Sequence, residues 1–219
     1  MNYKRLTLFC GHYGSGKTSI AVNTALTLRQ QRDNVALADL DIVNPYFRAK
    51  DSSDLLAREG IRLICSPFAN SNVDFPALPP EMYALTDDRS ITAVLDIGGD
   101  ERGALALGRI APRILEENNY EMLLVVNRYR PLTPDTDSVR EVMAEIENAC
   151  RIPFTGIVNN SNLGAETTAQ TVLDSRDYAG DIAKATGLPL VMTTVDAALL
   201  PELSGKIPDL YPLTIKRFL

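Results

Sequence analysis

Short runs of apolar residues recur along the chain, and most are nearly continuous rather than alternating with polar residues. Continuous runs of this length are typical of strands that are covered on both faces. They occur at residues 6–10, 35–38, 61–65, 91–97, 122–126, 154–158 and 188–192. We therefore predict a strand at each of these places.

Segments with helical periodicity lie between the runs. One face, after the start signal at residues 134–136, is formed by Val139, Val142, Met143, Ile146 and Cys150. A second, ended by Gly187, is formed by Val172, Ala179, Ile182, Ala183 and Thr186. Alternating strands and helices predict a three-layer α/β/α sandwich with a mainly parallel sheet.

The composition fits one ordinary globular domain, which we expect to span residues 1–219. The Pro-rich stretch 75–80 is interpreted as a loop rather than a linker. A net charge of -6 argues against broad binding to nucleic acid or anionic membranes, and we find no transmembrane stretch. The three cysteines form no Cys-x-x-Cys pair, which favours reduced thiols in a cytoplasmic protein.

The segment GHYGSGKT, residues 11–18, follows the first predicted strand and precedes a helix, as a phosphate-binding loop does. Its glycines allow backbone N–H groups to point at phosphate oxygens. Lys17 adds a cation for the β- and γ-phosphates, and Thr18 a hydroxyl for Mg²⁺. The alternative is a glycine-rich turn that binds nothing. The predicted nucleotide-binding residues here are Gly11, His12, Tyr13, Gly14, Ser15, Gly16, Lys17, Thr18 and Ser19.

Acidic residues follow two further strands, at the sheet edge where ligand-binding loops gather. Asp39 and Asp41 are suited to holding Mg²⁺ or orienting a water, although a turn or helix cap explains them equally well. Asp96 ends an apolar strand, as a Walker B aspartate does, and the Gly99 N–H is placed to meet a γ-phosphate. Because a phosphate-binding loop is also present, these short patterns favour a nucleotide site more strongly than they would alone.

Two asparagines follow a late strand. The Asn160 side chain offers a donor and an acceptor to the edge of a purine, whereas for Asn159 we favour a role in a turn. A guanine-specific loop usually reads Asn-Lys-x-Asp, but here Asn160 is followed by Ser161, Asn162 and Leu163. The missing Asp favours adenine, so we expect ATP and Mg²⁺ as the cofactors.

Over almost its whole length the chain resembles the MinD/ParA superfamily of P-loop ATPases. The resemblance implies that Asp41 positions the attacking water, that Asp39 supports the Mg²⁺ shell, and that Asp96 belongs to the Walker B site. It also implies that Asn160 contacts adenine and that the chain acts as a homodimer on an unidentified protein partner. The segment 188–202 is similar to the family's last nucleotide-side strand, so Val195 and Asp196 would flank the base.

One departure concerns the family's signature lysine, which reaches the partner subunit's phosphates. His12 stands at that position and Tyr13 replaces the usual glycine after it, so the trans-lysine mechanism is not carried over. A packing or capping role for His12 is an equal alternative. The lysine is also absent from dethiobiotin synthetase and related ligases of the same broad fold.

Three functions follow. The first is a Mg²⁺-dependent ATPase switch, in which Lys17 and Asp41 are the catalytic residues and Thr18, Asp39 and Asp96 handle the metal. The second is an ATP-dependent ligase or kinase that phosphorylates a small carboxylate. Arg48, Arg102 and Arg109 could contact such a substrate or act as an arginine finger, although surface salt bridges are the more common role of such residues. The third is an adaptor that binds ATP without hydrolysis. The C-terminal residues 215–219 are basic and apolar but too short for stable membrane anchoring.

Overall fold

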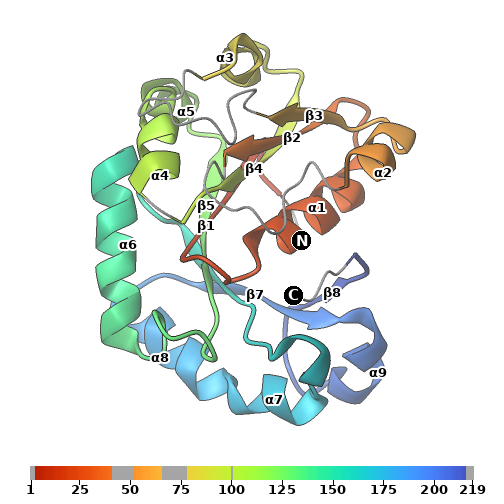
Figure 1. Ribbon diagram of the computed structural model, residues 1–219, viewed down its shortest axis with the longest axis vertical. Coiled ribbons are helices and arrows are strands. Elements are labelled where there is room, and N and C mark those ends of the chain that lie inside the picture. The colour runs from red at the N-terminus through yellow and green to blue at the C-terminus, as the bar shows by residue number, and fades with distance from the viewer. Residues whose placement is uncertain (1–2, 41–51, 66–77, 100, 216–219) are drawn as a thin grey trace.

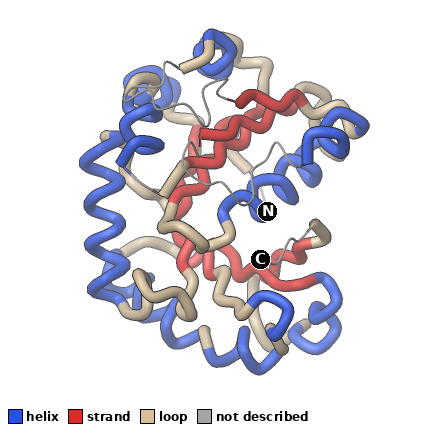
Figure 2. Tube along the Cα trace, viewed as in Figure 1, coloured by secondary structure: helices blue, strands red, loops and turns tan. Residues whose placement is uncertain are grey.

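The computed structural model describes residues 3–40, 52–65, 78–99 and 101–215. Within these residues, eight strands form one sheet in the order β3-β2-β4-β1-β5-β6-β7-β8, and every pairing is parallel (Figures 1 and 2). The strands are β1 Leu6–Cys10, β2 Val35–Leu40, β3 Arg62–Cys65, β4 Thr92–Ile97, β5 Tyr120–Val126, β6 Gly156–Asn159, β7 Leu190–Asp196 and β8 Leu210–Leu213.

Helices connect the parallel strands and cover both faces of the sheet, which confirms the predicted fold class. They are α1 Lys17–Arg29, α2 Ser53–Arg58, α3 Pro80–Asp87, α4 Glu101–Gly108, α5 Ala111–Glu117, α6 Thr136–Cys150, α7 Ala169–Asp174, α8 Arg176–Thr186 and α9 Leu200–Leu203, with the 3-10 turns η2 Gly164–Glu166 and η3 Ala197–Leu199. None of the helices in the described ranges is long and apolar enough to cross a membrane.

The core is divided by the sheet because successive side chains of a strand point to opposite faces. Leu8 of β1 packs in a cluster with side chains of α4, α5, α6 and α8. Phe9, the next residue, packs in a second cluster with α1 and α2. Figure 1 shows the same division, with α4 and α6 on one side of the sheet and α1 on the other. Both faces of the central strands are therefore dry, which explains their continuous apolar sequences.

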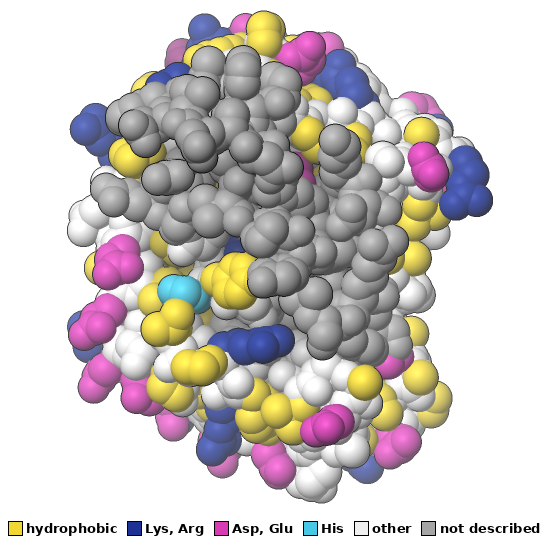
Figure 3. Space-filling model, in the orientation of Figure 1, with side chains coloured by type: hydrophobic (Ala, Val, Ile, Leu, Met, Phe, Trp, Pro, Cys, Tyr) yellow, Lys and Arg dark blue, Asp and Glu magenta, His cyan; other side chains and the backbone are white. Residues whose placement is uncertain are grey.

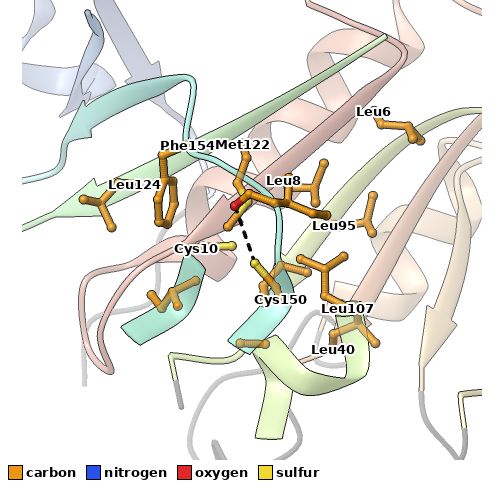
Figure 4. Close-up of a cluster of buried hydrophobic side chains, with 14 of the residues drawn as sticks. Leu6, Leu8, Cys10, Leu40, Leu95, Leu107, Met122, Leu124, Cys150 and Phe154 are labelled. Carbon is orange, nitrogen blue, oxygen red and sulfur yellow. Dashed lines mark hydrogen bonds between the residues drawn. The ribbon is translucent and has the colours of Figure 1, made fainter. Parts of the chain in front are cut away.

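Two cysteines belong to the first of these clusters. Figure 4 shows Cys10 and Cys150 near Leu8, Leu107 and Phe154. Burial raises the pKa of both thiols, so they remain protonated at neutral pH and pack as small apolar groups. None of the three cysteines, all of which lie in described parts of the chain, is in a disulfide.

The structure departs from the predicted elements at two places. The helical face predicted up to Gly187 is split into α7 and α8 at Ser175, whose buried hydroxyl donates to the carbonyl of Val172 and accepts from Asn159 Nδ2. The sequence pattern also missed β8. This edge strand has four residues, one of them Pro212, so it lacks the long apolar run by which the other strands were recognised.

Candidate functional site

The loop between β1 and α1 has the backbone that the glycine pattern predicts. Gly11, Gly14 and Gly16 have φ values of 144°, 75° and 91°, a region that favours glycine. Gly16 is the N-cap residue of α1, and no side chain caps this helix start. Backbone N–H groups at an uncapped helix start and in the loop before it are donors that an anion such as phosphate could accept.

Two of these glycines are also required because the loop lies very close to neighbouring parts of the chain. A Cβ atom on Gly11 would lie 2.4 Å from the carbonyl oxygen of Val125 in β5. One on Gly16 would lie 2.1 Å from Nδ2 of Asn160, just after β6. The shape of the loop is thus fixed by the ends of β5 and β6 as well as by its own torsion angles.

Lys17 and Thr18 begin α1 and are both buried. Lys17 Nζ lies 3.4 Å from the carbonyl oxygen of His12, so the side chain folds back over the loop. The hydroxyl of Thr18 donates to Oδ2 of Asp96 at 2.6 Å. The structure therefore brings together the predicted phosphate cation, the predicted metal-binding hydroxyl and the predicted Walker B carboxylate.

Asp39 and Asp96 lie side by side at the ends of β2 and β4. The two residues are direct partners in the parallel pairing of these strands, so their side chains leave the same face of the sheet, and both residues are buried. This placement fits a divalent cation near Thr18.

Thr18, Asp39 and Asp96 offer oxygen donors, the ligand type that Mg²⁺ prefers. No group of three or more His, Cys, Asp or Glu side chains that could hold a metal ion occurs among the described residues. Mg²⁺ typically takes one or two carboxylates, a hydroxyl, waters and substrate phosphates. Thr18 and Asp96, with Asp39 beside them, would supply the protein part of such a shell.

Gly99 follows β4 and packs directly on the loop after β1. A Cβ atom on Gly99 would lie 2.5 Å from the carbonyl oxygen of Gly11, 2.8 Å from the carbonyl carbon of His12 and 2.8 Å from the amide nitrogen of Tyr13. These are backbone atoms, which cannot give way without moving the loop. The two loops therefore pack backbone against backbone, and only a residue without a side chain fits at position 99.

Replacing Gly99 with alanine is expected to destabilise the protein by about 1–3 kcal/mol, because the new methyl group overlaps backbone. The matched control is Gly180→Ala in α8, where an added Cβ meets nothing within 4 Å. That change is expected to stabilise the protein by about 0.5–1 kcal/mol through helix propensity. Urea denaturation measures both; equal midpoints for the two variants would contradict the tight packing at Gly99.

Asn160 links the loop to β7. Its Nδ2 donates to the carbonyl oxygen of Ser15 at 2.6 Å, and its Oδ1 accepts from the hydroxyl of Thr194. The predicted contact with a base is not tested by this geometry, but it would have to coexist with these two bonds or replace them. Asn159 bonds to Ser161 and Ser175 within the protein, the turn role that the sequence favoured.

The remaining predicted loop residues differ in exposure. Ser15 is buried, and its hydroxyl has no hydrogen-bond partner among the described residues. His12 and Ser19 are half-buried, and the His12 carbonyl accepts from the Ser15 amide. Tyr13 is 47% exposed. A buried polar group without a partner is costly, so Ser15 fits a ligand that would supply one.

Several predicted residues lie outside what the structure describes. Asp41 and Arg48 fall in the range 41–51, and residues 216–219 of the C-terminal segment also lie outside the described residues. The side chain of Arg102 is likewise not described, and Arg109 is exposed just beyond α4. Their predicted roles therefore stay predictions. Asp196, proposed to flank the base, accepts a hydrogen bond from the Ala198 amide at the start of η3.

Sequence reasoning missed the loop after β5, residues 127–135. Asn127, which is fully buried, accepts from the amides of Tyr129 and Asn162 and so joins this loop to the one after β6. The side chain of Arg130 lies against Gly14. The signal was available, because β5 neighbours β1 in the sheet and its carboxyl end opens onto the same edge.

The chain matches no protein-family model and no curated protein sequence. Solved structures of FtsY are similar to it. Thermotoga maritima FtsY, a cell division protein, has a TM-score of 0.55 at 19% identity, over 87% of this chain and 61% of that one. Chloroplast FtsY from Physcomitrella patens has a TM-score of 0.57 at 15% identity, over 88% and 59%. The signal recognition particle receptor FtsY from Elizabethkingia anophelis, in complex with GDP, has a TM-score of 0.51 at 15% identity, over 89% and 58%.

These similarities settle the fold. The chain has the α/β P-loop NTPase fold. It spans about three-fifths of the length of the FtsY chains that it matches. At such low identity the likeness carries no residue roles, so membership of the MinD/ParA superfamily stays a prediction.

Proposed function

We propose that the chain binds a purine nucleoside triphosphate with Mg²⁺, hydrolyses it, and acts as a nucleotide-dependent switch on a protein partner. The observation that carries the proposal is the uncapped start of α1 beneath a positive-φ glycine loop, with Thr18 bonded to the buried Asp96. This arrangement combines phosphate donors with a metal-compatible pair. The P-loop NTPase fold of the FtsY structures supports it.

The phosphate tail would be held by backbone amides of residues 11–18 and by Lys17. Lys17 is held close to the loop by the His12 carbonyl, and its ammonium group needs little rearrangement to meet a phosphate. Ser15 would offer its hydroxyl from the buried side of the loop. These donors are fixed before binding, so little ordering is needed when the nucleotide arrives.

Thr18 and Asp96, with Asp39 beside them, would hold the Mg²⁺ ion and its waters. When bound, the ion neutralises charge on the β- and γ-phosphates and helps to orient the scissile bond. The hydrogen bond between Thr18 and Asp96 keeps both side chains aimed at one place. Asp41, which follows β2 in the sequence, is proposed to align the attacking water.

The switch would act through the loop after β4. Gly99 packs on the backbone of Gly11, His12 and Tyr13. A γ-phosphate bound at the loop after β1 would therefore favour a different conformation of the loop after β4 than its absence would. A partner that contacts the outer surface of the loop after β4 can then distinguish the two nucleotide states.

In a homodimer, the second copy of the chain would contact this surface. Sedimentation with and without nucleotide tests whether the chain forms a dimer and whether the dimer depends on nucleotide.

We propose ATP rather than GTP as the preferred nucleotide. A carboxylate that accepts the guanine N–H groups would be expected at residue 163, and this chain has Leu163, an exposed aliphatic side chain. Asn162, its neighbour, uses its side chain on the Asn160 carbonyl and the Gly164 amide. Because an FtsY structure of this fold was solved with GDP, GTP is the alternative to compare directly.

Titration calorimetry with Mg-ATP and Mg-GTP in parallel, followed by a phosphate-release assay, tests the proposal. We expect binding of both triphosphates through the phosphate tail, tighter for ATP, and slow release of phosphate that a partner would accelerate. Phosphate release that appears only when a small carboxylate is supplied would instead favour phosphoryl transfer. Tighter binding of GTP would overturn only the proposed preference for adenine, and the proposed binding and hydrolysis of a triphosphate would stand.

A further inference from the structure

The loop after β5 is a rigid support next to the phosphate-binding loop. The Arg130 amide donates to the Asn127 carbonyl at 3.1 Å, and the Thr133 amide donates to the Arg130 carbonyl at 3.2 Å. The Thr133 hydroxyl also donates to the Asn127 carbonyl at 3.1 Å. These bonds close a compact turn on a buried asparagine, so the backbone at Arg130 has a defined position.

Two neighbouring side chains of this loop point to α7. Arg128 Nη1 donates to the Asp174 carbonyl at 2.6 Å, and the Tyr129 hydroxyl donates to the Thr171 carbonyl at 2.9 Å. The side chain of Arg130 instead lies next to Gly14. A Cβ atom built on Gly14 would lie 3.5 Å from Arg130 Nε and 3.7 Å from its Cδ and Cζ, so the guanidinium group lies along the phosphate-binding loop.

Arg130 forms no ion pair with an acidic side chain of the described residues, and the residue is exposed. Lys17, the other cation at this loop, is nearly inaccessible to solvent, and its Nζ lies 3.4 Å from the His12 carbonyl oxygen. On the face drawn in Figure 3, Lys and Arg side chains are interspersed with Asp and Glu side chains. A nucleoside triphosphate remains negative after binding one Mg²⁺, so a second cation at the rim has a clear electrostatic use.

We propose that Arg130 is a phosphate-binding residue that closes the outer rim of the nucleotide site, where its guanidinium donates to oxygens of the phosphate tail. This inference rests on the proposed function. The planar guanidinium has several N–H donors and matches phosphate geometry better than the imidazole of His12, which is shorter. The Arg130 side chain lies next to Gly14, so it is placed beside the phosphate-binding loop.

The test compares Arg130→Gln, Arg130→Lys and the control Arg128→Gln by calorimetric titration with Mg-ATP and Mg-GTP. Arg130→Gln is expected to raise about tenfold the Kd for whichever triphosphate the wild type binds. This is the usual effect of losing one charged hydrogen bond. Arg130→Lys should recover part of the loss, and Arg128→Gln should bind as wild type does. The salt dependence of Kd should also become shallower in Arg130→Gln, which a purely structural role would not produce.

Each other outcome is decisive. If wild type binds and Arg130→Gln binds within twofold of it, the role of Arg130 is overturned and the proposed function stands. If Arg128→Gln weakens binding as much as Arg130→Gln, the effect belongs to the loop as a whole and the inference is again overturned. If wild type binds neither nucleotide, the proposed function fails and this inference fails with it.

Discussion

Replacing Lys17 with alanine is expected to raise the Kd for the Mg-triphosphate by at least about 100-fold, because a charged donor that contacts two phosphates contributes on the order of 1.5–3 kcal/mol per hydrogen bond. The buried ammonium is already placed over the loop by the His12 carbonyl. Titration calorimetry measures the change, and circular dichroism checks that the fold is retained.

The matched control for this prediction is Lys184→Ala. Lys184 lies in α8 and is exposed, and it pairs only loosely with Asp181 at 3.5 Å. Its loss removes the same charge from the protein as a whole but none from the loop. Similar weakening in the two variants would mean that Lys17 acts through net charge and not through a phosphate contact.

Replacing Glu117 with alanine is expected to destabilise the protein by about 3–5 kcal/mol, because it leaves the charge of Arg5 buried without its partner. Both side chains are almost fully buried in an ion pair with two hydrogen bonds, and Arg5 also donates to the carbonyls of Leu85 and Ile91. Chemical denaturation of wild type, Glu117→Ala and Glu116→Ala measures the effect. Glu116 is the exposed neighbour in α5, and its loss should change stability by less than about 0.5 kcal/mol.

This ion pair also predicts a pH dependence. Hydrogen bonding from Arg5 lowers the pKa of Glu117 below its ordinary value of 4.5, despite the opposing effect of burial. A carboxyl whose pKa is lower in the folded state stabilises the protein above the unfolded pKa and loses that contribution as the pH falls. The stability difference between wild type and Glu117→Gln should therefore shrink below about pH 4.5. A difference that stays constant there would contradict the pairing.

Most of the sheet could be predicted from the sequence because its central strands are buried on both faces. β1, β2, β4 and β5 are continuous apolar runs, and their carboxyl ends meet at one edge as parallel strands must. β8 was not predicted because it has only four residues, one of which is Pro212. The break between α7 and α8 depends on the Ser175 hydroxyl meeting Asn159, a long-range contact that periodicity does not contain.

The candidate site was predictable where local sequence determines geometry. The glycine spacing predicts the positive φ values of Gly11, Gly14 and Gly16. The sequence also predicts Thr18 and Asp96 at one metal site, and a hydrogen bond joins them in the structure. The bond from Asn160 to the Ser15 carbonyl could not be foreseen, because it depends on how β6 is placed relative to β1. Arg130 was overlooked because its loop matches no phosphate-binding motif.

A crystal structure with Mg²⁺ and a non-hydrolysable ATP analogue tests the central claim most directly. We predict that the β-phosphate lies among the amides of residues 11–18, with Lys17 on the phosphates and Thr18 and Asp96 at the metal. At a saturating concentration of the analogue, a nucleotide bound away from residues 11–18 would contradict the account. A crystal structure in which no phosphate contacts these residues would contradict it as well.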